Sequence, residues 1–135
     1  MKIRYLLPAF VWALTIIVLI LMPSGNIPKT KLLNIPHIDK LVHFGLFFVL
    51  SILLDFGFRK QPFKSFLQKN HYTISLLFCV IFGVGTELLQ FVFTSQGRSA
   101  TVLDFIANFS GALAGVFALF VLLKNPAVDH FICRI

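Results

Sequence analysis

Charged side chains are scarce in this chain. Only 13% of its 135 residues are Asp, Glu, Lys or Arg, whereas 58% are hydrophobic. The mean hydropathy of +0.90 is far higher than the core of a water-soluble domain requires. This composition argues against a soluble enzyme or binding module and favours a protein whose main solvent is lipid.

Motifs that mark common activities are also missing. The sequence has no nucleophile elbow, phosphate-binding loop or dinucleotide fingerprint, and its His and acidic residues match no strong zinc signature. Cys79 lies inside an apolar run and Cys133 near the C-terminus, so a disulfide between them is not expected. We therefore predict neither a metal nor a cofactor.

Four long apolar runs dominate what is present. A helix needs about 20 residues to cross a hydrocarbon layer about 30 Å thick, and four strands alone cannot close a barrel. No small-x-small cleavage site follows Met22, so the first run is expected to be an anchor rather than a signal peptide. We predict an all-α integral membrane protein, a single domain over residues 1–135 with four transmembrane helices in one bundle. The predicted helices span residues 5–22, 41–58, 72–93 and 102–123.

The distribution of Lys and Arg predicts the orientation. Eight of the 12 flank the two termini and the connection between the second and third runs, and four lie on the other side. By the positive-inside rule both termini face the cytoplasm, which makes the chain a multi-pass protein of the cytoplasmic membrane. The net charge of +7 is explained by lipid headgroup contact, since no nucleic-acid recognition motif accompanies it.

Polar residues inside the apolar runs are the candidate functional residues, because Asp or Arg at mid-membrane costs about 2.5–3.5 kcal/mol. They occur in pairs three or four residues apart, so each pair shares one helix face. In the predicted orientation, all of these polar residues lie in the outer half of the membrane, including Arg98, which is not part of a pair. The predicted outward-facing binding site consists of Asp39, His43, Glu87, Gln90, Arg98, Asp104 and Asn108.

The starts of the second and fourth helices would point at this site, each with a partial positive charge of about half a unit. With Arg98 they would attract a phosphate, pyrophosphate or carboxylate, although three carboxylates would repel it unless they are neutralised. Structural roles are the alternatives. Asp104 fits a capping box with Thr101 at the start of its helix. Asp39 has Lys40 as its neighbour, so its negative charge is less unusual. Glu87 would serve as a structural partner that holds helices together.

Small residues continue the faces of the polar ones. Gly83 lies one turn below Glu87, and Gly111 and Gly115 lie below Asn108. Small residues let helices approach closely in a bilayer, so we expect the third and fourth helices to touch there. Asp55, with Arg59 four residues on, is expected to form a local ion pair.

The order and spacing of these residues resemble the VanZ-like family over about residues 5–123. The resemblance rests on Asp39-Lys40-x-x-His43-Phe44, on Glu87-x-x-Gln90, and on Arg98 followed by Asp104-x-x-x-Asn108-x-x-Gly111-x-x-x-Gly115. It implies a bacterial membrane protein of about four helices, from a family whose namesake is associated with resistance to the glycopeptide antibiotic teicoplanin. It also implies that the seven polar residues form one site.

Three functions fit this sequence. The first is a protein that binds or shields a cell-envelope lipid, a lipid-linked wall precursor or a lipoglycopeptide. The second is an intramembrane hydrolase or transferase, with Glu87 or His43 as general acid or base, Asp104 orienting His43, and Arg98 and Asn108 stabilising negative charge. The third is a structural subunit that associates through the Gly111–Gly115 face. The oligomeric state does not follow from the sequence.

Overall fold

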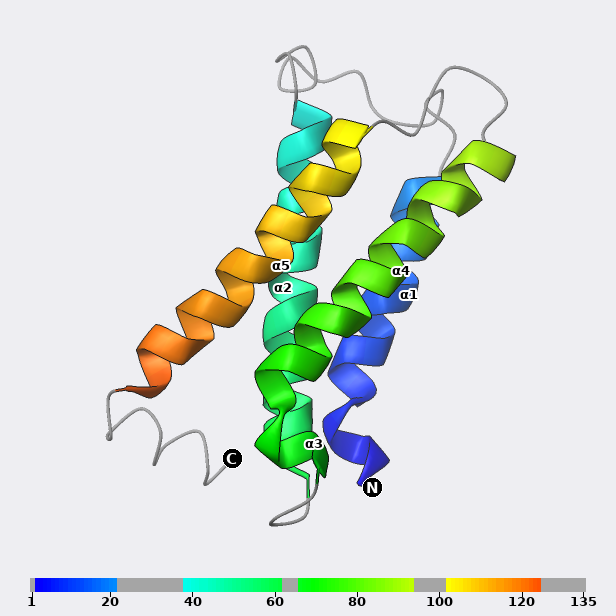
Figure 1. The fold of residues 1–135 in the computed structure, drawn as a ribbon. Helices are drawn as coiled ribbons and strands as arrows, with labels where there is room; N and C mark the ends of the chain where they lie inside the picture. Colours follow the sequence, from blue (N-terminus) through cyan, green and yellow to red (C-terminus); the bar gives the residue numbers. More distant parts are fainter. Residues whose placement is uncertain (1, 22–37, 62–65, 94–101, 125–135) are drawn as a thin grey trace.

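The computed structural model describes residues 2–21, 38–61, 66–93 and 102–124. Within these ranges the chain forms helices and no strand. Figure 1 shows the long helices side by side, with the short helix α3 at the lower end, where the chain also starts. The elements are η1 (Ile3–Tyr5), α1 (Leu7–Leu21), α2 (Ile38–Arg59), α3 (Phe66–Lys69), α4 (His71–Phe93) and α5 (Val102–Leu123).

Three of these helices, α2, α4 and α5, are long and apolar enough to cross a membrane. The first predicted crossing is a shorter apolar helix, because α1 has 15 residues. At 1.5 Å per residue it spans about 22 Å, less than the hydrocarbon thickness of about 30 Å. The all-helical architecture is thus observed, whereas which ends face the cytoplasm stays a prediction.

Helix boundaries follow the apolar runs closely at α5, whose bounds are those predicted. The structure starts α2 at Ile38, three residues before the predicted start. Asp39 and Lys40 therefore belong to the first helical turn, since polar side chains interrupt an apolar run without interrupting a helix. This extra turn carries charged side chains toward the candidate site.

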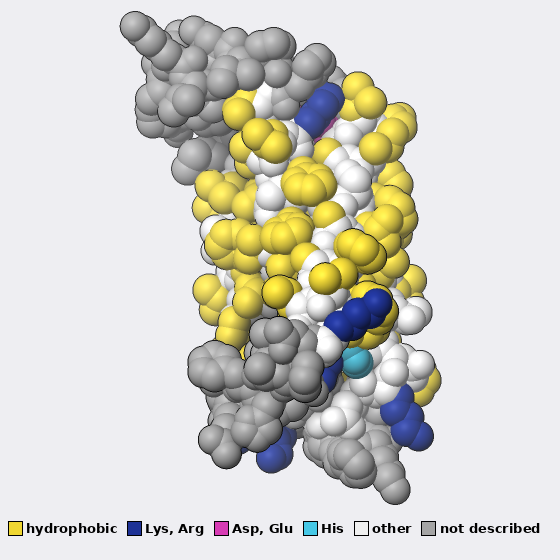
Figure 2. Space-filling model, turned by 90° about the vertical axis from the view of Figure 1, so that its left-hand side faces the viewer, with side chains coloured by type: hydrophobic (Ala, Val, Ile, Leu, Met, Phe, Trp, Pro, Cys, Tyr) yellow, Lys and Arg dark blue, Asp and Glu magenta, His cyan; other side chains and the backbone are white. Residues whose placement is uncertain are grey.

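Large apolar side chains from α1 and α2 fill much of the bundle interior, whereas α4 contributes small and polar ones. The buried face of α4 consists of Ser75, Cys79, Gly83, Thr86 and Gln90. Large apolar residues of α4 point outward instead, as do many of those in α1 and α5. Figure 2, which views the bundle from the side of α5, shows hydrophobic side chains covering the middle of that face, with Lys and Arg side chains near its two ends. This arrangement suits a lipid solvent, in which small residues at helix contacts allow close packing.

Two glycines permit the closest helix approach, and the structure corrects their predicted partner. A Cβ atom on Gly111 would overlap the backbone carbonyl of Phe44, and one on Gly115 would overlap the Ser51 side chain. Both obstacles belong to α2, so this glycine face packs against α2 rather than α4. Spacing along a helix reveals which residues share a face but not which neighbour covers it.

Gly83 does lie where the third and fourth predicted helices meet. A Cβ atom there would be 3.6 Å from Cβ of Asn108 on α5 and 3.4 Å from the Phe47 ring on α2. The most extensive helix contact in the bundle is nevertheless that between α2 and α5. These two helices start at the same end of the bundle, as Figure 1 shows, and so bring their first turns together.

Candidate functional site

The candidate site lies at the end of the bundle where α2 and α5 begin and α4 ends. Asp39 lies in the first turn of α2, and Asp104 lies in the first turn of α5. The last two turns of α4 supply Glu87 and Gln90. Three segments far apart in the sequence therefore deliver polar side chains to one region.

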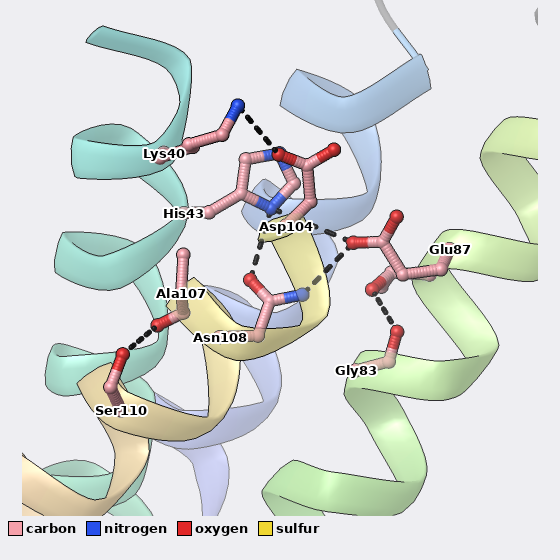
Figure 3. Close-up of polar contacts among 9 residues, drawn as sticks. Lys40, His43, Gly83, Glu87, Asp104, Ala107, Asn108 and Ser110 are labelled. Atoms are coloured by element: carbon pink, nitrogen blue, oxygen red, sulfur yellow. Dashed lines mark hydrogen bonds and ion pairs between the residues drawn. The ribbon is translucent and has the colours of Figure 1, made fainter. Parts of the chain in front are cut away.

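A chain of hydrogen bonds joins the three helices at the centre of this region (Figure 3). Nδ1 of His43 lies 3.0 Å from Oδ1 of Asn108, and Nδ2 of Asn108 donates to Oε1 of Glu87 at 3.0 Å. His43 and Asn108 are buried, with exposed fractions of 3% and 1%. Asn108 is therefore the link that fixes the position of His43 relative to Glu87.

The direction of these bonds sets the tautomer of His43. An amide oxygen only accepts hydrogen bonds, so Nδ1 of His43 carries the hydrogen in this arrangement. The same Nδ1 lies 3.8 Å from Oε1 of Glu87, within ion-pair range when the ring is protonated. In the neutral ring, Nε2 keeps a lone pair and is able to accept a proton or a hydrogen bond.

Glu87 has one oxygen to spare. Its Oε2 atom is buried and has no hydrogen-bond partner among the described residues, and the whole side chain is 12% exposed. A buried oxygen without a partner is destabilising by about 1–3 kcal/mol, so such atoms are uncommon unless they serve a ligand or hold water. The carboxylates of Asp39 and Asp104 are close enough to interact electrostatically with Glu87. The site is therefore rich in hydrogen-bond acceptors.

Lys40 belongs to this site although it is not among the seven predicted site residues. Its Nζ lies 3.7 Å from Oδ1 of Asp104, whose side chain is 5% exposed (Figure 3). Lys40 and Asp104 therefore form an ion pair between α2 and α5. Thr101, its expected partner in a capping box, lies outside the described residues. His43 is three positions after Lys40, and this helical spacing was the signal that could have placed both on one face.

A small cavity lies beside His43. Its volume is about 30 Å³, enough for a single water molecule. Polar lining comes from Asp39, His43 and Gln90, and apolar lining from α1 and α2. Asp39 and Gln90 therefore belong to the site as lining residues of the cavity beside His43.

The structure brings together six of the seven predicted site residues, and Arg98 lies outside the described part of the chain. His37 does as well. Among the described residues no group of three or more His, Cys, Asp or Glu side chains is arranged to hold a metal ion.

A second buried polar pair lies at the opposite end of the bundle. Oδ1 of Asp55 lies 2.6 Å from Nδ1 of His71, and the Asp55 side chain is fully buried. This contact joins α2 to α4, in addition to the expected local pairing of Asp55 with Arg59, which stays a prediction. Pairing along one helix is visible in the sequence, whereas pairing between helices depends on packing. Oδ2 of Asp55 and Oγ of Ser75 are buried without a hydrogen-bond partner in the described ranges.

These features define a multi-helix membrane protein with a buried polar site between three helices. The chain belongs to the VanZ/LLP1 family, whose family model matches residues 5–124. Comparison with curated proteins and with solved structures gave no match.

Proposed function

We propose that the site formed by α2, α4 and α5 binds or shields a cell-envelope lipid, a lipid-linked wall precursor or a lipoglycopeptide. The observation that carries the proposal is the unpartnered Oε2 of Glu87, held in place through Asn108 and His43. Family membership supports a role in the envelope, since the family's namesake is associated with teicoplanin resistance.

The balance of charges favours a particular ligand chemistry. Asp39, Glu87 and Asp104 supply carboxylates, and Lys40 is the cation paired with one of them. Such a site is better suited to hydroxyl, amide N–H or ammonium groups than to a bare phosphate. Sugars and peptides of wall precursors and glycopeptides carry these donor groups. In the predicted orientation the site opens toward the outer leaflet, where such molecules are found.

The first test is antibiotic susceptibility. A sensitive Gram-positive host expresses the wild type or Glu87→Gln at matched membrane abundance, with vancomycin as the comparison drug. Glutamine keeps the size of the side chain and removes its charge. We expect teicoplanin protection with the wild type and none with Glu87→Gln.

Leu88→Ala is the matched control, because Leu88 is the next residue of α4 and is 60% exposed on its lipid-facing side. It should protect as well as the wild type. If neither the wild type nor Leu88→Ala protects the host, the proposal that this protein gives teicoplanin resistance is wrong.

Ligand binding is tested separately by mass spectrometry of lipids that co-purify with the protein. The proposal expects an enriched polyprenyl-linked or glycopeptide species with the wild type. Its amount should fall with Glu87→Gln and stay unchanged with Leu88→Ala. Identical lipid profiles for all three proteins would contradict binding at this site.

An intramembrane hydrolase or transferase is the second candidate, and the state of His43 favours it. Nε2 of a neutral His43 is able to act as a general base, and the adjacent cavity has room for a water molecule. Asn108 contacts Nδ1 of His43 and would orient the ring. Turnover of an envelope substrate that is abolished by His43→Gln, with binding retained, would favour catalysis over binding.

The third alternative, association through Gly111 and Gly115, is weakened by the packing. Phe44, Phe48 and Ser51 of α2 already cover this face within the same chain. A partner helix would have to displace α2 to reach it.

A further inference from the structure

An apolar groove lies at the end of the bundle opposite the polar site. It has a volume of about 180 Å³ and is lined by α1, α2, α4 and the residue that precedes α1. Ala9, Ala13 and Leu54 form its buried floor, and Phe10 and Phe78, which are 63% and 42% exposed, flank it at the surface. The groove is therefore open to the surroundings of the bundle along its side.

The small side chains of Ala9 and Ala13 create this space. They lie four residues apart on the same face of α1, where larger residues would fill the gap against Leu54. An apolar cavity of comparable size does not hold water and takes apolar guests. A hydrocarbon chain is thus the occupant that the lining favours.

The end of the groove lies beneath η1, which is fixed to the end of α2. The backbone N–H of Lys2 donates to Oε1 of Gln61 at 2.9 Å, and Nε2 of Gln61 donates to the carbonyl of Gly57 at 3.1 Å. Gly57 allows this contact, because a Cβ atom there would be 2.7 Å from the Tyr5 carbonyl oxygen. Leu6, which follows η1, then lines the groove.

Three cationic side chains gather around Tyr5 at this point. The Arg4 guanidinium lies 4.8 Å from the centre of the Tyr5 ring and donates to its hydroxyl at 2.8 Å. Nζ of Lys60 lies 5.7 Å from the same ring. The hydrogen bond from Arg4, aided by the charges of Lys2 and Lys60, holds the pKa of Tyr5 below its ordinary value. Asp55, the acidic residue of this half of α2, is buried and engaged by His71.

We infer that an anionic phospholipid binds at this place, with its phosphate at Lys2, Arg4 and Lys60 and one acyl chain in the groove. The cations would attract the headgroup, and the groove would take the hydrocarbon. The predicted orientation assigns this lipid to the cytoplasmic leaflet. The inference is independent of the function proposed for the polar site.

Native mass spectrometry of the purified full-length chain tests it. The protein is offered phosphatidylglycerol and phosphatidylcholine with identical acyl chains at equal concentration. We expect clear retention of phosphatidylglycerol over phosphatidylcholine. Lys60→Gln should lower phosphatidylglycerol binding about fivefold, as expected for the loss of one surface cation, without changing phosphatidylcholine binding.

Lys124→Gln is the matched control. Lys124 also lies over an aromatic ring, 4.7 Å from the centre of Phe120, and follows α5 at the same end of the bundle. It does not contribute to the groove or to the cation group around Tyr5. Its substitution should leave the phosphatidylglycerol preference intact. Equal losses from Lys124→Gln and Lys60→Gln would overturn the inference, as would a wild type without any preference.

The acyl chain is located by a phosphatidylglycerol that carries a photoreactive group in its chain. It should label peptides containing Phe10 or Phe78 more than those of α5, and Ala13→Phe should reduce this labelling by filling the groove. Glycerol phosphate without acyl chains should not compete. Labelling spread equally over all helices, or full competition by glycerol phosphate, would contradict a lipid site.

Discussion

Replacing Gly111 by alanine adds a single methyl group where α5 meets the backbone of α2. The new Cβ would lie 2.9 Å from the carbonyl carbon of Phe44 and 3.0 Å from its Cα. Carbon atoms prefer separations of about 3.5 Å or more, so the helices must separate by at least about 0.6 Å. Backbone atoms in a helix cannot rotate away as a flexible side chain would.

The magnitude follows from two opposing effects. Alanine favours the helix over glycine by up to about 1 kcal/mol, whereas overpacking costs about 1–3 kcal/mol, at the upper end here because backbone is the obstacle. We expect a net loss of about 1–2 kcal/mol in unfolding free energy. The same displacement along the line from His43 to Asn108 would lengthen their 3.0 Å contact to about 3.6 Å, beyond hydrogen-bonding range.

The assay is reversible unfolding by SDS in mixed micelles, followed by the fluorescence of Trp12. Gly45→Ala is the matched control, since a Cβ atom on this α2 glycine would meet nothing within 4 Å. It should be neutral or stabilising. If Gly111→Ala proved as stable as Gly45→Ala, then α2 and α5 would not approach as closely as described.

Three further predictions concern the buried polar pairs and the orientation. Asn108→Leu should lower the unfolding free energy by about 1–2 kcal/mol. A double-mutant cycle of His43 and Glu87 should give a coupling energy in the wild-type background and none in the Asn108→Leu background, and equal coupling in both would deny the link. His71→Ala should cost about 3 kcal/mol or more in the same SDS assay, since it strands the Asp55 carboxylate, and Asp55→Leu/His71→Leu should recover most of that loss. Failure of the double variant to recover would show another role for the pair. A C-terminal fluorescent-protein fusion should fluoresce and a C-terminal alkaline phosphatase fusion should be inactive, and the reverse would invert the orientation.

The sequence predicted the helices well because apolar runs of membrane length have few other interpretations. For α5 even the end residues agree, since Val102 and Leu123 coincide with abrupt changes in polarity. The start of α2 was placed too late because Asp39 and Lys40 look like the end of a loop when hydropathy alone is considered. The sequence did not reveal that α1 is short, because the apolar run at residues 5–22 extends beyond the 15 residues of the helix.

The candidate site was assembled from helical spacing, and in the structure Asn108 of α5 donates to Glu87 of α4. Spacing could not reveal which helix covers which face. The pairing of Asp55 with His71 and the packing of Gly111 on α2 depend on how the helices are arranged around one another. Such contacts are properties of the tertiary structure and leave no local pattern.

The small and polar interior of α4 has a consequence for how the fold responds to temperature. Separating the helices within a bilayer would move Ser75, Cys79 and Gly83 from protein contacts to lipid tails, exposing little apolar surface to water. Exposure of apolar surface to water is what gives soluble domains their large heat-capacity increase on unfolding. The stability of this bundle against helix separation should therefore change almost linearly with temperature, without the low-temperature decline that curvature produces in soluble proteins.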